Sequence, residues 1–237
     1  MMEWLLASID PTRPHIVDFA TSWHGRIMTL SWGVIAPLAV LIARYFKILP
    51  GQHWPDELDN KVWWRSHWIG QTAGFGLSAI GFALVFWTDG GAWLPHSLIG
   101  YAVLAFGFAQ ILSGIWRGTK GGPTAPAPDG SWAGDHYDMT RHRLIFEMIH
   151  KSAGYVALAL GAAAVLTGLW AANAPRWMWL GIAAWWLALL AAAVWLQRRG
   201  RAVDTYQAIW GPDERHPGNR LPTQGWGAAR PSDIQSL

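Results

Sequence analysis

The sequence predicts an all-α integral membrane protein, specifically a five-helix transmembrane bundle. Hydrophobic residues make up 52% of its 237 residues and charged residues only 14%, whereas a soluble domain carries about 25% charged residues. The apolar residues also gather in five long runs, each able to cross a hydrocarbon core of about 30 Å. A chain of this length has room for such a bundle and for little else.

The five apolar runs should be helices, because a segment surrounded by lipid must satisfy its own backbone hydrogen bonds. Pro37 lies inside the first run, where neighbouring helices allow a kink without a break. The expected spans are 25–46, 63–88, 94–116, 144–171 and 177–196.

Lys and Arg residues indicate the orientation of these spans. An odd number of spans places the termini on opposite sides, with fifteen Lys and Arg on the carboxyl-terminal side and three on the other. The more basic side of a membrane protein is cytoplasmic. Residues 1–22 should therefore be periplasmic and the carboxyl end cytoplasmic, in a bacterial inner membrane. Residues 23–198 form the transmembrane domain.

Two segments outside the spans are rich in Gly and Pro. The loop 118–140 should be irregular and cytoplasmic. The cytoplasmic tail, 199–237, has seven Gly or Pro residues between Gly211 and Gly227 and is not expected to form a packed domain by itself, although a partner could order it. The basic residues lie mostly at span ends, so the net charge of +3 indicates topology and not binding to nucleic acid.

Four histidines occupy equivalent positions, each near the start of one of the first four spans. Because successive spans run in opposite directions, His24 and His96 should share a depth near the periplasmic face. His67 and His150 should share one near the cytoplasmic face. An intramembrane imidazole needs a partner and is the commonest metal-binding side chain, so four matched positions favour a functional site over four snorkelling rings.

The number of ligands at each depth indicates the kind of metal site. The chain has no Cys, which excludes thiolate-held iron–sulfur clusters and haem attached through Cys. Zinc or copper would need three or four ligands at one depth, whereas two His facing each other across a bundle suit a haem with both axial positions filled. Glycines near the ligands would leave room for the macrocycle, although helix packing explains Gly70 and Gly74 equally well. These glycines are Gly70, Gly74, Gly100 and Gly154.

At these residues the chain resembles the cytochrome b561 family, particularly the core fused to extracellular modules of the dopamine-monooxygenase amino-terminal type. The matching stretches are HGRIMTLSWGVIAPLAVLIARY from His24, HWIGQTAG from His67, HSLIGYAVLAFGFAQILSG from His96 and RLIFEMIHKSAGY from Arg143. The resemblance implies a four-helix haem-binding core with two non-covalent haem b groups. His24 and His96 would ligate one haem, and His67 and His150 the other.

Basic residues flank the second histidine pair in the sequence and should surround the cytoplasmic entrance to the haem site that this pair forms. They could fix the topology, pair with haem propionates or attract an anionic donor. Arg65 and Arg143 are the expected propionate partners, because a planar guanidinium binds a carboxylate through two hydrogen bonds.

These features predict a dihaem b-type cytochrome that carries electrons between a cytoplasmic or quinol-type donor and a periplasmic-side acceptor, or the reverse. In the family such proteins often oxidise ascorbate or a quinol and reduce ferric iron. The expected partners are membrane lipid, a small redox donor such as a quinol, and a periplasmic redox protein. The alternative is an accessory haem-bearing subunit of a larger membrane complex. A transporter is disfavoured, because the deep parts of the spans contain no acidic residue.

Overall fold

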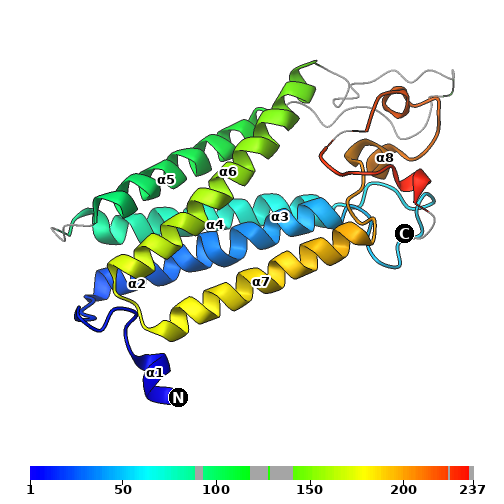
Figure 1. Ribbon diagram of the computed structural model, residues 1–237. Helices are drawn as coiled ribbons and strands as arrows, with labels where there is room; N and C mark the ends of the chain where they lie inside the picture. Colours follow the sequence, from blue (N-terminus) through cyan, green and yellow to red (C-terminus); the bar gives the residue numbers. More distant parts are fainter. Residues whose placement is uncertain (89–92, 118–127, 129–140, 224, 235–237) are drawn as a thin grey trace. The chain divides into compact units, whose positions relative to one another are not determined.

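The computed structural model (Figure 1) describes residues 1–88, 93–117, 128, 141–223 and 225–234. The prediction for the loop 118–140 therefore falls outside the described residues, apart from Pro128.

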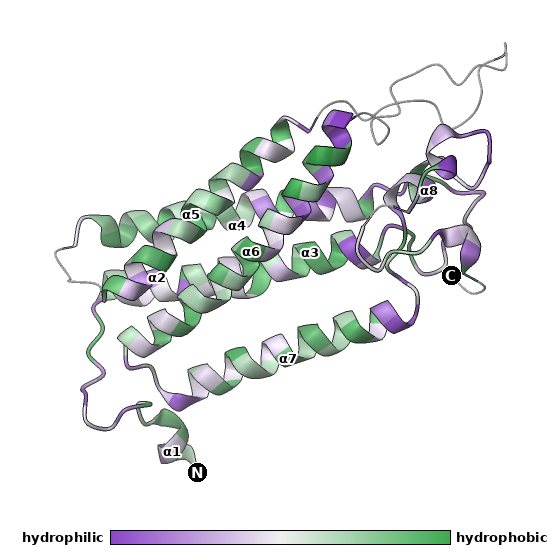
Figure 2. Cartoon of the chain, turned by 45° about the horizontal axis from the view of Figure 1, so that its top comes forward, coloured by the Kyte–Doolittle hydropathy of each residue, from purple (hydrophilic) through white to green (hydrophobic). Residues whose placement is uncertain are grey.

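Five helical spans in the described residues are long and apolar enough to cross a membrane, which confirms the predicted fold class. The first span combines three consecutive helices, and each of the others is one α-helix. Figure 2 shows apolar residues along the long helices and hydrophilic ones at the amino-terminal end of α6 and at both ends of α7. The elements are α2 (Phe19–Met28), η1 (Thr29–Ile35), α3 (Ala36–Tyr45), α4 (Val62–Phe86), α5 (Leu94–Ile115), α6 (Arg141–Ala171) and α7 (Arg176–Arg198).

The first span starts at Phe19, earlier than its apolar residues alone predict. Asp18 caps this helix, because its side chain accepts a hydrogen bond of 2.9 Å from the backbone N–H of Thr21. Such a cap satisfies one of the backbone donors that have no partner in the first turn. The helix can therefore begin in a polar stretch.

The chain divides into two compact units, which are described separately. Unit 1 consists of Met1–Leu38, Ile69–Ile111 and Ala153–Ala191. Unit 2 consists of Ala39–Trp68, Leu112–Ser152 and Ala192–Leu237.

In unit 1, the first span contains a π-helix, η1, directly before Pro37, where the sequence predicts only a kink. Proline has no N–H to bond the carbonyl four residues earlier, which here belongs to Gly33. That carbonyl instead accepts hydrogen bonds from the indole N–H groups of Trp185 and Trp186, at 2.9 and 3.1 Å. The tryptophans of α7 thus satisfy the backbone group that Pro37 releases.

Glycines let helices of unit 1 approach closely. The indole of Trp32 lies against Gly107 and Gly161, where an added Cβ would meet its ring at 3.1 and 3.0 Å. A Cβ added at Gly74 would lie 3.5 Å from the side chain of Ile35 in η1, so this predicted glycine lies in a contact between two helices.

In unit 2, the tail folds against the first loop of the same chain. It contains α8 (Thr205–Trp210), η3 (Pro217–Arg220) and η4 (Pro231–Asp233). Every residue of α8 is buried, and its apolar side packs against Trp63 of α4. Lys47 donates to the carbonyl of Val203 at 2.7 Å. Burial, followed by repulsion from Lys151, lowers the pKa of Lys47 to about 8. The apolar residues of the tail are ordered by contact with other segments of the chain, which the sequence alone does not show.

Candidate functional site

The first histidine pair lies in unit 1 and joins α2 to α5. The ring centroids of His24 and His96 are 6.1 Å apart, with the ring planes at 89°. Nδ1 of His24 lies 2.9 Å from the carbonyl oxygen of Gly81, and Nδ1 of His96 lies 3.2 Å from the hydroxyl of Thr167. That hydroxyl donates to the carbonyl of Ala163 at 2.8 Å, so it accepts from His96. Both rings thus carry the proton on Nδ1 and leave Nε2 free to bind a metal.

The second histidine pair lies in unit 2 and joins α4 to α6. The ring centroids of His67 and His150 are 6.3 Å apart, with the planes at 75°. Nδ1 of His150 lies 2.9 Å from the hydroxyl of Ser113. Nδ1 of His67 is buried and makes no well-formed hydrogen bond with the described residues, although the Ala39 backbone lies beside this ring. The orientation of the second pair is therefore fixed less completely than that of the first.

Both separations fit a single metal ion between two imidazoles. With a metal–nitrogen bond of about 2.0–2.1 Å and a ring centre about 1 Å beyond the nitrogen, two axial rings have centres about 6 Å apart. Within the described part of the chain, no three His, Asp or Glu side chains gather into a metal site. This donor set of two imidazoles fits the axial positions of haem iron and does not provide the three or four ligands of a zinc site.

Gly168 of α6 lets the ring of His96 lie directly on the helix backbone. An added Cβ at this position would be 3.0 Å from Cε1 of His96. Among the predicted glycines, Gly100 has nothing within 4 Å of an added Cβ, and Gly154 has only Oε1 of Gln110 at 3.8 Å. No side chain of the described residues therefore packs tightly on either of these two positions.

Of the two predicted arginines, the structure places Arg143 beside the second pair. Its guanidinium lies 4.7 Å from the ring centroid of Phe146, and that ring stacks on His150 with centroids 5.0 Å apart. Arg143 is only 5% exposed and donates to Glu147 at 3.2 Å. Arg65 lies on an exposed face of α4, and its side chain makes no hydrogen bond or ion pair with the described residues.

Sequence reasoning did not identify three residues that orient or accommodate the ligands. Thr167 and Ser113 hold Nδ1 atoms of two histidines, and Gly168 accommodates a ring. Each acts on a ligand from another helix. Ser, Thr and Gly are all common in membrane helices, so the sequence does not distinguish these three residues from the others. Only the contacts between helices identify them.

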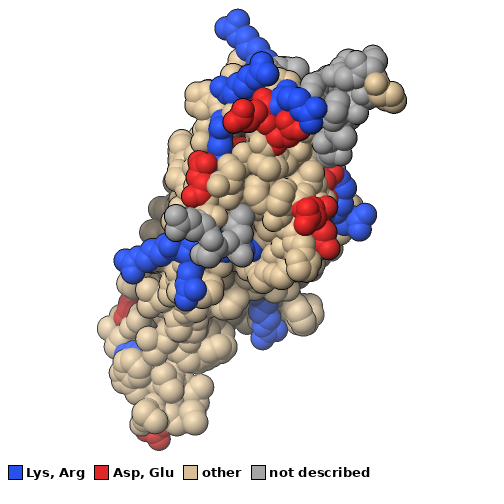
Figure 3. Space-filling view, turned by 90° about the vertical axis from the view of Figure 1, so that its right-hand side faces the viewer, with Lys and Arg blue, Asp and Glu red and all other residues tan. Residues whose placement is uncertain are grey.

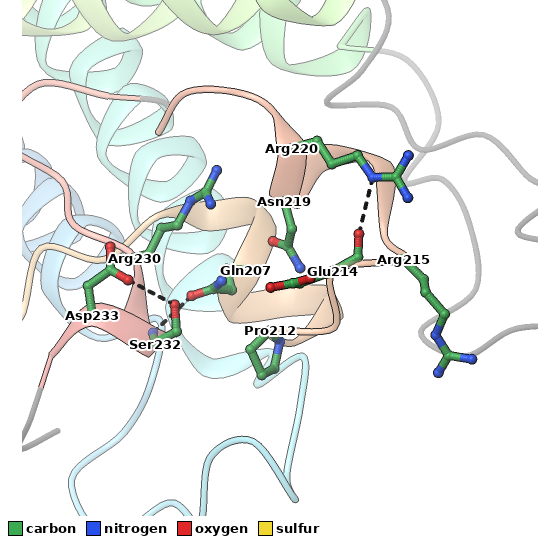
Figure 4. Close-up of a pocket in the computed structure, with 9 residues that line it drawn as sticks. All are labelled: Gln207, Pro212, Glu214, Arg215, Asn219, Arg220, Arg230, Ser232 and Asp233. Atoms are coloured by element: carbon green, nitrogen blue, oxygen red, sulfur yellow. Dashed lines mark hydrogen bonds between the residues drawn. The ribbon is translucent and has the colours of Figure 1, made fainter.

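A separate polar cavity of about 540 Å³ lies in the tail (Figure 4). Its lining includes Arg220 and Arg230 as well as Glu214 and Asp233, and it contains no histidine. Figure 3 likewise shows Lys and Arg beside Asp and Glu on the face that it presents. Charges of both signs and the lack of imidazole ligands distinguish this cavity from the two histidine pairs.

The fold and the two histidine pairs define a helical membrane protein with paired intramembrane imidazoles. The chain is 29% identical over 150 residues to a cytochrome b561 and DOMON domain-containing protein of Arabidopsis thaliana. A second protein of that description from the same plant is 24% identical over 150 residues, and a cytochrome b561, DM13 and DOMON domain-containing protein is 26% identical over 148. These matches confirm the resemblance to the cytochrome b561 family.

Each of these three alignments covers 62% of this chain but only 27%, 31% and 14% of the respective relatives. The chain thus spans less than a third of the length of these relatives. No model of a protein family matches the chain, and no solved structure matches it.

Proposed function

We propose that the protein is a dihaem b-type cytochrome that carries electrons across the membrane. One haem would lie between His24 and His96, and the other between His67 and His150. The observation that carries this proposal is the separation of 6.1 and 6.3 Å between the ring centroids of the two pairs. The cytochrome b561 names of the relatives support haem chemistry. Without Cys in the chain, the haems would be held non-covalently.

The residues of the chain bind and orient the two groups. When bound, each haem would supply an iron that gains and loses one electron. Nε2 of each histidine would occupy an axial position, and the hydrogen bonds at Nδ1 of His24, His96 and His150 hold the rings in place. Such bonds also make the ligands more basic. Because two histidines would hold each iron, the sites would suit electron transfer and not the binding of a substrate at iron.

The charge asymmetry of the sequence supports an assignment of the two sites to the two sides of the membrane. With the carboxyl end in the cytoplasm, the second pair would face a cytoplasmic or quinol-type donor. The first pair would then face a periplasmic acceptor, with the reverse flow equally allowed. In this arrangement Arg143 would hold a propionate beside His150. Arg65, being exposed, would instead attract an anionic donor by its charge.

Two other functions receive less support from the structure. A tail in need of a partner would favour an accessory subunit of a larger complex, but this tail packs on its own chain. Glu147 is the one acidic residue in the five described spans, and Arg143 and Lys151 both pair with it. Transporters normally carry ionisable groups deep within their spans, so a single acidic residue near the start of one span disfavours a transporter.

The haem content tests the proposal directly. We expect two haem b groups per chain, both low-spin because both axial positions are filled by imidazole. Haem quantitation against protein and a reduced-minus-oxidised visible spectrum measure this. One haem per chain, no haem, or a spectrum that changes with carbon monoxide would contradict it.

A second prediction separates the two arginines. In Arg143→Lys, we expect the midpoint potential of the second haem to fall by up to about 60 mV, a tenfold change in a one-electron equilibrium constant. Lys keeps the charge but loses the planar two-bond contact with a carboxylate, so the negative propionate is compensated less well. Redox titration followed by visible absorption gives the potential.

Arg65→Lys is the matched control for this measurement. Its potentials should equal those of the wild type, because the replaced side chain is exposed. Equal potentials in all three proteins would leave Arg143 with a role in packing and topology only.

A further inference from the structure

The amino-terminal helix α1 (Met2–Leu6) exposes large apolar side chains outside the five spans. Met2, Trp4 and Leu6 are 70%, 55% and 60% exposed, and no residue of this helix is buried. Isolated exposed apolar residues are ordinary, but Met2 and Leu6 are four residues apart and so share one side of the helix, and an exposed apolar face marks an interaction surface. The helix contains five residues and is therefore far too short to cross a membrane.

This helix is held firmly to the beginning of α7, beside which it lies in Figure 1. The backbone N–H of Arg176 donates to Ala7 at 3.0 Å, and that of Ile9 donates to Ala174 at 3.2 Å. The guanidinium of Arg176 donates to the carbonyl of Trp4 at 3.2 Å and lies 5.0 Å from the centroid of its indole. All these residues belong to unit 1.

Side chains farther along the segment strengthen the attachment. Asn173, in the turn between α6 and α7, accepts from the backbone N–H of Asp10 at 3.0 Å. It also donates to the carbonyls of Asp10 and Arg13, at 3.0 and 2.6 Å. The apolar helix is therefore not a loose terminus that happens to be exposed.

The attachment fixes the depth of α1 in the membrane. Arg176 is the first residue of a span, so Trp4 lies at the level where α7 enters the bilayer. The exposed side chains of Trp170 and Trp177 flank the same turn, and tryptophan is enriched where lipid headgroups meet the acyl chains. The exposed apolar side chains of α1 thus lie at the level of the tryptophans around the beginning of this span.

We propose that α1 is a membrane-surface anchor that lies at the boundary between headgroups and acyl chains, in the leaflet where α7 begins. Met2 and Leu6 contact lipid, and Arg176, through Trp4, ties the anchor to the bundle. Apolar side chains that enter this boundary bind in proportion to their buried area. This anchor is independent of the proposed electron transfer.

Single cysteines test the anchor cleanly, because the chain contains no Cys. Leu6→Cys is labelled with an environment-sensitive nitrobenzoxadiazole dye in phosphatidylcholine vesicles. Thr12→Cys is the matched control, because Thr12 is exposed in the same segment and its hydroxyl bonds to Asp10 at 2.6 Å in a polar turn. We expect a blue-shifted emission for the label at residue 6. Lipids with a nitroxide near the headgroup should quench it at least threefold more than the label at residue 12.

Equal quenching at the two positions would overturn the anchor. So would a label at residue 6 that neither nitroxide lipid nor aqueous iodide reaches, since that result indicates a protein partner. Unchanged far-ultraviolet circular dichroism and melting temperature show that each labelled protein is folded. If Leu6→Cys does not fold, Met2→Cys gives the same measurement on the same helix.

Discussion

Replacing His24 or His96 by Ala is expected to abolish one and the same haem and to spare the other. His67→Ala and His150→Ala should together define the second haem. The reason is geometric, because each pair brings its two rings to 6.1 or 6.3 Å and lies within one unit of the chain. Each substitution should halve the haem content, which low-temperature difference spectra and haem quantitation measure.

His142→Ala is the matched control for these substitutions. His142 is exposed on the same helix as His150, and its Nε2 lies 3.1 Å from the carbonyl of Trp116. Both haems should remain in this variant. If His24→Ala and His67→Ala instead removed the same spectral component, the pairing proposed here would be wrong.

Gly168→Ala should reduce the occupancy of the first haem although it changes no ligand. The added methyl group would meet Cε1 of His96 at 3.0 Å, so the ring must move from its place on α6. Alanine favours a helix over glycine by about 0.8–1 kcal/mol. Haem should therefore be lost while the intrinsic stability of the helix rises. We expect less than half of the normal content of the first haem, with the second unchanged.

Gly181→Ala provides the comparison, because nothing lies within 4 Å of a Cβ added there. This variant should keep both haems. Difference spectra measure occupancy and circular dichroism measures helix content. Full occupancy of the first haem in Gly168→Ala would show that the contact with His96 does not constrain ligation.

The spans and the histidine pairs were accessible from the sequence for separate physical reasons. Lipid requires long apolar helices, so the composition alone predicts the spans. Alternating helix directions place His24 level with His96 and His67 level with His150, and the structure brings the same rings together. Both inferences use properties of single segments, namely the apolar length of a span and the position of its histidine.

Features that depend on packing between segments could not be predicted in this way. Thr167 and Ser113 gain their roles only because α6 and α5 present them to ligands on neighbouring helices. The burial of α8 likewise depends on Trp63, far away in the sequence. Arg65 and Arg143 both lie close to a histidine ligand in the sequence. Arg65 is exposed and Arg143 is buried because their helices turn different faces toward the rest of the protein, which the sequence does not show.

Pro37 in the first span affects the position of α7, the span that carries none of the four histidine ligands. Because Pro37 has no N–H to offer the carbonyl of Gly33, this carbonyl is a single acceptor to which two adjacent indoles of α7 bind. Hydrogen bonds between membrane helices contribute about 0.6 kcal/mol each, and up to about 2 kcal/mol. Their greater effect is positional, because a shift of α7 by one residue would break at least one of them. These bonds thus give α7 a defined register against the span that bears His24.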